Sequence, residues 1–93
     1  MGGMPRVSFT SHLQRFLDAP PREVTGSTVA AALEEVLADN PRLRGYVLDE
    51  RGGVRQHVTI FVDDQPIRDR AALTDAVSHD AEIFVLQALS GGS

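Results

Sequence analysis

The clearest pattern along the chain is a helical stripe of apolar residues. They recur at the i, i+3, i+4, i+7 and i+8 spacing of an amphipathic helix, as Val29, Ala32, Leu33, Val36 and Leu37. Ser27 or Thr28 offers a side-chain oxygen that can cap the N-terminus of this helix. Pro41 should stop it, because proline disfavours helical geometry in the residue before it. The pattern therefore predicts a helix near residues 28–39.

Shorter apolar runs predict strands. Residues 7–9 and 13–17 are typical of a β-hairpin, and residues 46–48 indicate a third strand. Residues 57–62 alternate, with Val58, Ile60 and Val62 on one face, and residues 83–86 form a last apolar run.

Polar and turn-forming segments separate these runs. Residues 18–23 contain a Pro-Pro pair and are expected to be a loop, as are residues 49–53 and 74–81. Asp63-Asp64 is expected to be a turn followed by a brief return strand at residues 65–67. The order predicts an α+β domain in which one helix packs on a mixed sheet of four to five strands.

Composition narrows the possible functions. The chain has 93 residues, which is one domain, and it has no cysteine, which excludes disulfides, thiolate metal sites and a cysteine nucleophile. Its net charge is −4 without a basic block, so neither nucleic acid nor an anionic membrane is an expected partner. The N-terminus lacks the apolar core of a signal peptide, and we expect a cytoplasmic protein.

The chain ends in small residues directly after its last apolar run. Gly91 and Gly92 precede Ser93, and we expect residues 88–93 to be a flexible tail. Glycine has no Cβ, so such a tail can enter a narrow channel and present its carboxylate to another enzyme. The alternative is a terminus or linker without chemistry.

Three stretches resemble the MoaD/ThiS-like family of ubiquitin-like sulfur carriers. They are the helix start at residues 26–29 (Gly-Ser-Thr-Val), the strand and turn at residues 57–64, and the final strand and tail at residues 82–92. The resemblance implies a single β-grasp, or ubiquitin-like, domain over residues 1–93. The long segment at residues 43–55 is closest to the branch whose carrier feeds a cysteine synthase.

The resemblance also implies a mechanism. An E1-like adenylyltransferase would use ATP to adenylate the Gly92 carboxylate, and sulfur would then replace the adenylate to give a thiocarboxylate. The sulfur would pass to an acceptor enzyme, a cysteine synthase or an enzyme of molybdopterin or thiazole synthesis. The chain would be a carrier, not an enzyme, with no bound cofactor. Because the family usually ends at the second glycine, Ser93 is expected to be foreign to the natural chain or to be removed by a protease.

Two aromatic residues are candidates for partner binding. If Val58, Ile60 and Val62 face the helix, Phe61 lies on the opposite, open face of the sheet, and Phe84 would enlarge the same apolar patch. Leu89 in the tail is a further candidate contact. The alternative is that these are isolated exposed apolar residues without a role.

Other candidate chemistry is weak. His12, His57 and His79 match no metal-ligand spacing, so no metal site is expected. The acidic pairs 49–50 and 63–64 are more typical of solvated turns than of paired catalytic carboxylates. Three classes of function remain open: a sulfur carrier, a ubiquitin-like protein modifier, and a β-grasp interaction domain whose tail has no chemistry.

Overall fold

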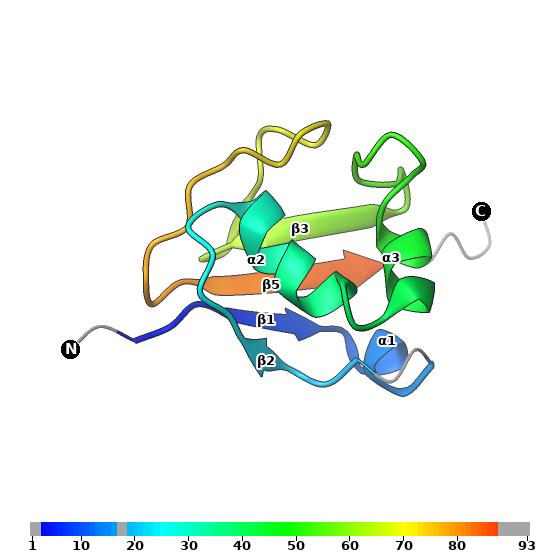
Figure 1. Cartoon of the computed structure of the whole chain (residues 1–93), viewed down its shortest axis with the longest axis horizontal. Helices are drawn as coiled ribbons and strands as arrows, with labels where there is room; N and C mark the ends of the chain where they lie inside the picture. The colour runs from blue at the N-terminus through cyan, green and yellow to red at the C-terminus, as the bar shows by residue number, and fades with distance from the viewer. Residues whose placement is uncertain (1–2, 17–18, 88–93) are drawn as a thin grey trace.

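The protein folds around one mixed sheet of five strands. The computed structural model describes residues 3–16 and 19–87. The strands lie in the order β2-β1-β5-β3-β4 and comprise β1 (Arg6–Phe9), β2 (Arg22–Glu23), β3 (Val58–Val62), β4 (Gln65–Pro66) and β5 (Glu82–Gln87). The first and last strands, β1 and β5, pair in parallel at the centre, as expected for a β-grasp fold, and the other pairs are antiparallel (Figure 1).

The predicted amphipathic helix is α2 (Val29–Leu37), which crosses one face of the sheet (Figure 1). Thr28 is its N-cap, and the Thr28 hydroxyl accepts a hydrogen bond from the Ala31 N–H at 3.1 Å. All five residues of the predicted stripe are buried. They pack in one core with apolar side chains of the strands, including Val7, Phe9, Ile60, Ile83 and Val85.

The N-terminus of α2 is completed by a distant loop. The Val29 N–H donates to the Asp75 carbonyl at 3.0 Å, and the Ala30 N–H donates to the Leu73 carbonyl at 2.9 Å. The first N–H groups of a helix have no partner within the helix, so these carbonyls satisfy two of them. The segment at residues 74–81, expected to be a loop, is thereby fixed against the helix.

The predicted hairpin of residues 7–9 with 13–17 is wrong. Residues 11–16 form a short helix, α1 (Ser11–Phe16), in which Leu13 is buried and the Gln14 amide donates to the Phe9 carbonyl at 2.7 Å. The antiparallel partner of β1 is instead β2, which lies in the segment that we expected to be a loop. Its two residues are both charged and exposed, so it carries no hydrophobic alternation to reveal it.

The predicted strand at residues 46–48 is also wrong, because this segment belongs to α3 (Pro41–Val47) and its C-cap. α2 does end before Pro41, but the same proline begins the next helix at a position where its missing N–H costs nothing. Asn40 caps α3 by accepting the Leu43 N–H at 3.1 Å. Leu43 and Val47, four residues apart, face the core. The sheet therefore carries three helices among the described residues, where we expected one.

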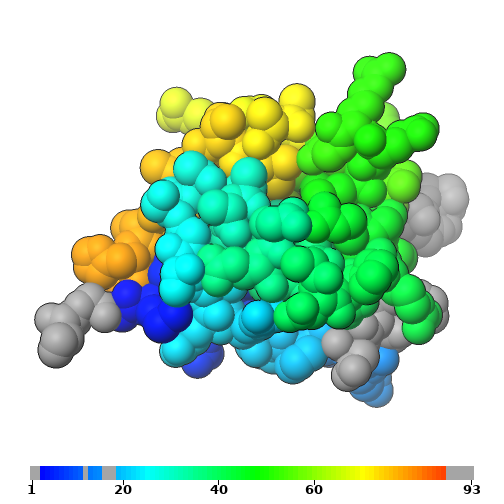
Figure 2. Space-filling view, viewed as in Figure 1, coloured from blue at the N-terminus to red at the C-terminus, as the bar shows by residue number. Residues whose placement is uncertain are grey.

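The helices leave one face of the sheet uncovered. The space-filling view from the helix side shows cyan and green residues of the helical layer over the centre of the molecule (Figure 2). On the opposite face Phe84 remains 38% exposed, although its neighbours Ile83 and Val85 are fully buried. This alternation along β5 separates a core face from an open face.

Candidate functional site

The open face of the sheet holds the two predicted aromatic residues side by side. β3 and β5 are antiparallel, and their register places Phe61 directly opposite Phe84. Ile60 and Val85, the next pair, point into the core and are fully buried. Side chains directly opposite on one face of an antiparallel pair are close enough to pack, so the two rings form one patch.

The exposure of the two rings differs. We expected Phe61 to be solvent-exposed, and it is half-buried, whereas Phe84 is exposed. Phe61 lies between two neighbouring strands, opposite Phe84 on β5 and Pro66 on β4, and this position explains its partial burial. Neither ring belongs to the buried core.

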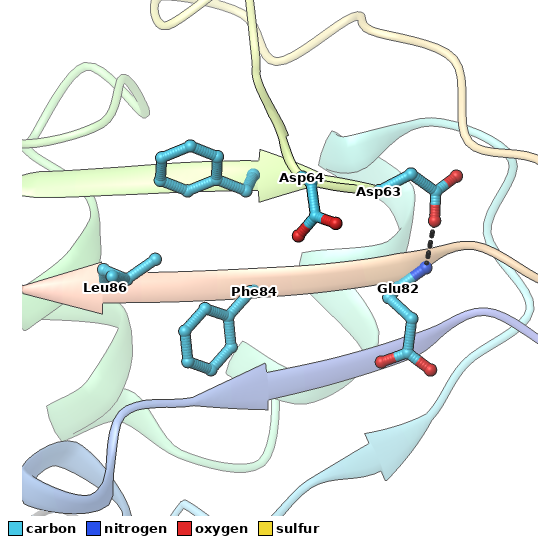
Figure 3. A pocket seen from close by; sticks show the side chains of 6 residues that line it. Asp63, Asp64, Glu82, Phe84 and Leu86 are labelled. Carbon is cyan, nitrogen blue, oxygen red and sulfur yellow. Dashed lines mark hydrogen bonds between the residues drawn. The ribbon is translucent and has the colours of Figure 1, made fainter.

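A shallow hollow surrounds this aromatic pair (Figure 3). We call it the open-face hollow. It is lined by Phe61, Asp63, Asp64, Glu82, Phe84 and Leu86. We did not predict Leu86 as a partner-binding residue, although it follows Phe84 by two residues and therefore lies on the same face of the strand. The hollow is apolar along β5 toward Leu86 and acidic at the opposite end.

The acidic end is built by the turn between β3 and β4. Asp63 and Asp64 have φ values of 50° and 69°, in the left-handed region that Asp tolerates better than most residues. The Asp63 carboxylate accepts the Glu82 N–H at 2.9 Å, and the Asp63 N–H donates to the Glu82 carbonyl at 2.9 Å. The expected turn is confirmed, and β5 starts beside it.

The hollow leads toward the C-terminal tail. β5 ends at Gln87, one residue after Leu86, and its arrowhead points toward α3 (Figure 1). Gly91, Gly92, Ser93 and Leu89 lie outside the described residues, as does the whole predicted tail of residues 88–93. Their assigned roles remain predictions.

A second group of carboxylates serves the fold. The Thr74 hydroxyl donates to Asp69 at 2.5 Å and the Ala72 N–H donates to it at 2.9 Å, and these hydrogen bonds lower the pKa of Asp69 to about 2. Hydrogen bonds from the backbone N–H groups of Arg68 and Asp69 lower the pKa of Asp75. Both carboxylates thus hold the loop that completes the N-terminus of α2.

A second hollow lies beside α3 and the loop after it. Three of its four charged groups are already engaged, the exception being Glu50: Arg44 pairs with Glu34 at 2.5 Å, the Arg55 Nε donates to the Gly45 carbonyl, and the Asp49 carboxylate accepts the Gly53 N–H. Within residues 3–16 and 19–87, no three His, Cys, Asp or Glu side chains gather as a metal-binding group. Over the same residues, no helix is long and apolar enough to cross a membrane. The open-face hollow is therefore the stronger candidate site.

Comparison with known proteins agrees with this fold. The model of the ThiS family matches residues 16–92. No curated protein sequence matches the chain.

Solved structures share the fold at low sequence identity. SAMP1 of Haloferax volcanii is 19% identical, with a TM-score of 0.80 over 97% of this chain and 100% of its own. A chain of the BexX/CysO complex of Amycolatopsis orientalis is 20% identical, with a TM-score of 0.79 over 95% and 99%. CysO of Mycobacterium tuberculosis is 20% identical, with a TM-score of 0.76 over 91% and 99%. At these identities the likeness establishes a ubiquitin-like β-grasp architecture and leaves function to be argued from the site.

Proposed function

The chain belongs to the ThiS family, and from that premise we propose that it is a sulfur carrier whose terminal glycine bears the transferred sulfur. One observation carries the proposal: the family match runs to Gly92 and so includes the last strand together with both glycines. The arrangement of the described residues supports it, because β5 leads from the open-face hollow directly toward the tail.

The proposed chemistry takes place on a partner enzyme. An E1-like adenylyltransferase joins the Gly92 carboxylate to AMP and releases pyrophosphate, which turns a poor electrophile into an acyl-adenylate with a good leaving group. A persulfide then attacks the acyl carbon and displaces AMP. A thiol cleaves the resulting acyl disulfide, which leaves a thiocarboxylate on Gly92. That sulfur is donated in the synthesis of cysteine, molybdopterin or thiazole.

The chain contributes recognition and delivery in this scheme. Phe61, Phe84 and Leu86 offer the apolar surface on which the adenylyltransferase docks, and Leu89 extends it into the tail. The glycines let the carboxylate enter a narrow active site. A carrier of this kind needs no acid, base or metal of its own, since ATP is bound and used by the partner.

A ubiquitin-like protein modifier is the second candidate. The fold similarity to the small archaeal modifier protein of Haloferax volcanii favours it. Both candidates share the adenylation step and differ in whether the acyl group ends on sulfur or on an amine. A β-grasp interaction domain without tail chemistry is the third candidate.

Intact-mass spectrometry tests the proposal on two forms of the protein, one ending at Gly92 and one at Ser93. With the adenylyltransferase of the same organism, ATP and a sulfur source, the Gly92 form should gain the mass of one oxygen-to-sulfur exchange. The Ser93 form should not, because one extra residue moves the carboxylate by up to about 3.5 Å and adds a side chain. A protease removing Ser93 would restore the reaction.

Two controls make the result decisive. A chain ending at Gln87 keeps every residue of the described core and should remain unmodified. Equal thiocarboxylate formation from the Gly92 and Ser93 forms would contradict the role given to Ser93. A Gly92 form that becomes attached to protein amines would favour the modifier, and one that is never adenylated would favour the interaction domain.

A further inference from the structure

Resting on the proposed function, we infer that Gln87 is a positioning residue for the adenylation step. Its side-chain amide oxygen is buried and has no hydrogen-bond partner among the described residues. When the tail lies in the adenylyltransferase, this oxygen accepts a backbone N–H of the tail. The hydrogen bond fixes the direction in which residues 88–92 leave the sheet, and with it the place of the Gly92 carboxylate.

Gln87 lies where the sheet ends. It is the last residue of β5, and it pairs with Val58, the first residue of β3. On the other side of β5, β1 ends at Phe9, which pairs with Val85. Neither β1 nor β3 therefore extends past Gln87. The tail begins with the next residue, so Gln87 is the last position at which the sheet can influence its direction.

The side chain of Gln87 lies on the core face of β5. Ile83 and Val85 point into the core and are fully buried, and alternation along the strand gives Gln87 the same side. The residue as a whole is half-buried, in contrast to these two neighbours. Gln87 therefore places an amide at the boundary between the core and the start of the tail.

The oxygen of this amide is the unusual feature. Among the described side chains, the Gln87 Oε1 is the one buried polar atom without a hydrogen-bond partner. The part-buried Gln14 shows the ordinary situation, because its amide donates to the Phe9 carbonyl at 2.7 Å. An unpaired buried acceptor destabilises the folded state. Methionine would fill a similar volume without this cost, so the fold alone does not favour glutamine here.

The tail supplies donors that need an acceptor in the complex. A backbone N–H that leaves water for a narrow enzyme channel must find a new hydrogen-bond partner. The N–H groups directly after Gln87 are those that its side chain can reach, whereas the enzyme has to provide acceptors for the groups farther along. The unpaired oxygen and the first N–H groups of the tail thus satisfy one another when the tail is bound.

The direction of the tail at its base determines where its end lies. Five residues lead from Gln87 to Gly92, and an extended segment of that length spans about 17 Å. A change of about 10° at the base would move the carboxylate by roughly 3 Å, and a misplacement of about 1 Å can slow a reaction about 100-fold. Gln87 should therefore act on the rate of adenylation and not on docking, which uses the open face.

The test replaces the amide while keeping the shape of the side chain. Gln87→Met removes the oxygen, and Gln65→Met is the matched control, at an exposed glutamine beside the opposite end of β3. All forms end at Gly92. ATP–pyrophosphate exchange with the adenylyltransferase of the same organism gives KM and kcat, and thermal unfolding of the isolated proteins gives the midpoint.

Gln87→Met should change stability and activity in opposite directions. The unfolding midpoint should rise by several degrees, because the unpaired buried oxygen is gone. At the same time kcat should fall about tenfold or more, with KM within about twofold of wild type. Gln65→Met should match wild type in all three quantities.

Several outcomes would overturn the role of Gln87 while leaving the carrier function intact. They are an unchanged kcat, an equal fall of kcat in Gln65→Met, and a raised KM at constant kcat, which would make Gln87 a docking contact. A lower unfolding midpoint in Gln87→Met would show that the oxygen is already paired in the free protein, and would overturn it as well. A wild-type chain that supports no exchange would instead overturn the proposed function, and the role of Gln87 with it.

Discussion

At the scale of single residues, the site depends on which side of β3 and β5 each side chain occupies. Phe61 and Phe84 are opposite one another, yet Ile60, Ile83 and Val85 beside them belong to the core. Aromatic pairs add about 0.5–1.5 kcal/mol beyond the area that they bury. The pair can therefore stabilise the protein slightly while still offering a surface to a partner.

This separation predicts the result of a double-mutant cycle. Phe61→Ala and Phe84→Ala should each lower the free energy of unfolding by about 1 kcal/mol, with a coupling of roughly 0.5–1.5 kcal/mol between them. Leu33→Ala, in the core and only 1% exposed, is the reference and should cost about 2–5 kcal/mol. Urea unfolding measures all four variants. A loss of several kcal/mol from Phe61→Ala would place Phe61 in the core and remove it from the docking surface.

At the scale of elements, short segments adopt the structure that their neighbours impose. The segment before α2 passes close to the first turn of the helix at Gly26. Thr25 ties the same segment to the helix farther along, because its N–H and hydroxyl donate to the Glu35 carboxylate at 3.0 Å. A Cβ on Gly26 would lie 2.4 Å from the Ala32 nitrogen. The helix can therefore approach this segment only where the side chain is absent.

Two glycine substitutions should act in opposite directions. Gly26→Ala should lower the free energy of unfolding by roughly 2–3 kcal/mol, because backbone atoms must shift to admit the methyl group. Gly45 lies inside α3, and apart from its chain neighbours and the backbone of its own helix no atom lies within 4 Å of an added Cβ. Gly45→Ala should therefore raise the free energy of unfolding, by up to about 1 kcal/mol. Thermal unfolding of both variants provides the comparison, and a harmless Gly26→Ala would contradict the close approach described here.

At the scale of the whole molecule, the two faces of the sheet have different tasks. One face carries the helices and the core, and the other carries the open-face hollow beside the strand that leads to the tail. The helical face is stabilised by a segment far away in the sequence, since carbonyls of the loop at residues 73–75 accept hydrogen bonds from the first N–H groups of α2. Asp69 and Asp75 fix that loop, so their ionisation bears on the stability of the whole domain.

Acid should destabilise the protein through these carboxylates. Hydrogen bonds in the folded state lower the pKa of Asp69 to about 2, below the value of about 3.9 for free aspartate. The stabilising effect of the hydrogen bonds to ionised Asp69 is complete above about pH 4 and is lost as the pH falls through about 2. Asp75, whose pKa is also lowered, contributes in the same direction.

Urea unfolding of Asp69→Asn at several pH values tests this expectation. The variant should be less stable than wild type at neutral pH, because Asn cannot accept every hydrogen bond that Asp69 accepts. The difference should narrow as the pH falls from about 4 toward 2, where wild type loses the same interactions. Asp64→Asn, at a carboxylate that accepts no hydrogen bond from the described residues, is the control. A difference that stays constant with pH would show that the charge of Asp69 is not responsible.

The sequence by itself determined the parts of this protein whose pattern is long or strongly alternating. The stripe of α2, the alternation of β3, the aspartate turn and the last strand all carry their own signal, because side-chain burial repeats with the period of the element. The same alternation placed Phe61 and Phe84 on one face. The glycine pair and the family resemblance supplied the proposed chemistry.

Only the tertiary structure decided the short elements and the assembly of the site. The segments predicted as strands at residues 13–17 and 46–48 are too short for their pattern to distinguish strand from helix, and contacts with the core select α1 and α3. β2 consists of two charged residues, and it is a strand only through its antiparallel pairing with β1. The acidic end of the open-face hollow also required the register: Asp63 and Glu82 are 19 residues apart, and the pairing of β3 with β5 lets the Glu82 N–H donate to the Asp63 carboxylate at 2.9 Å.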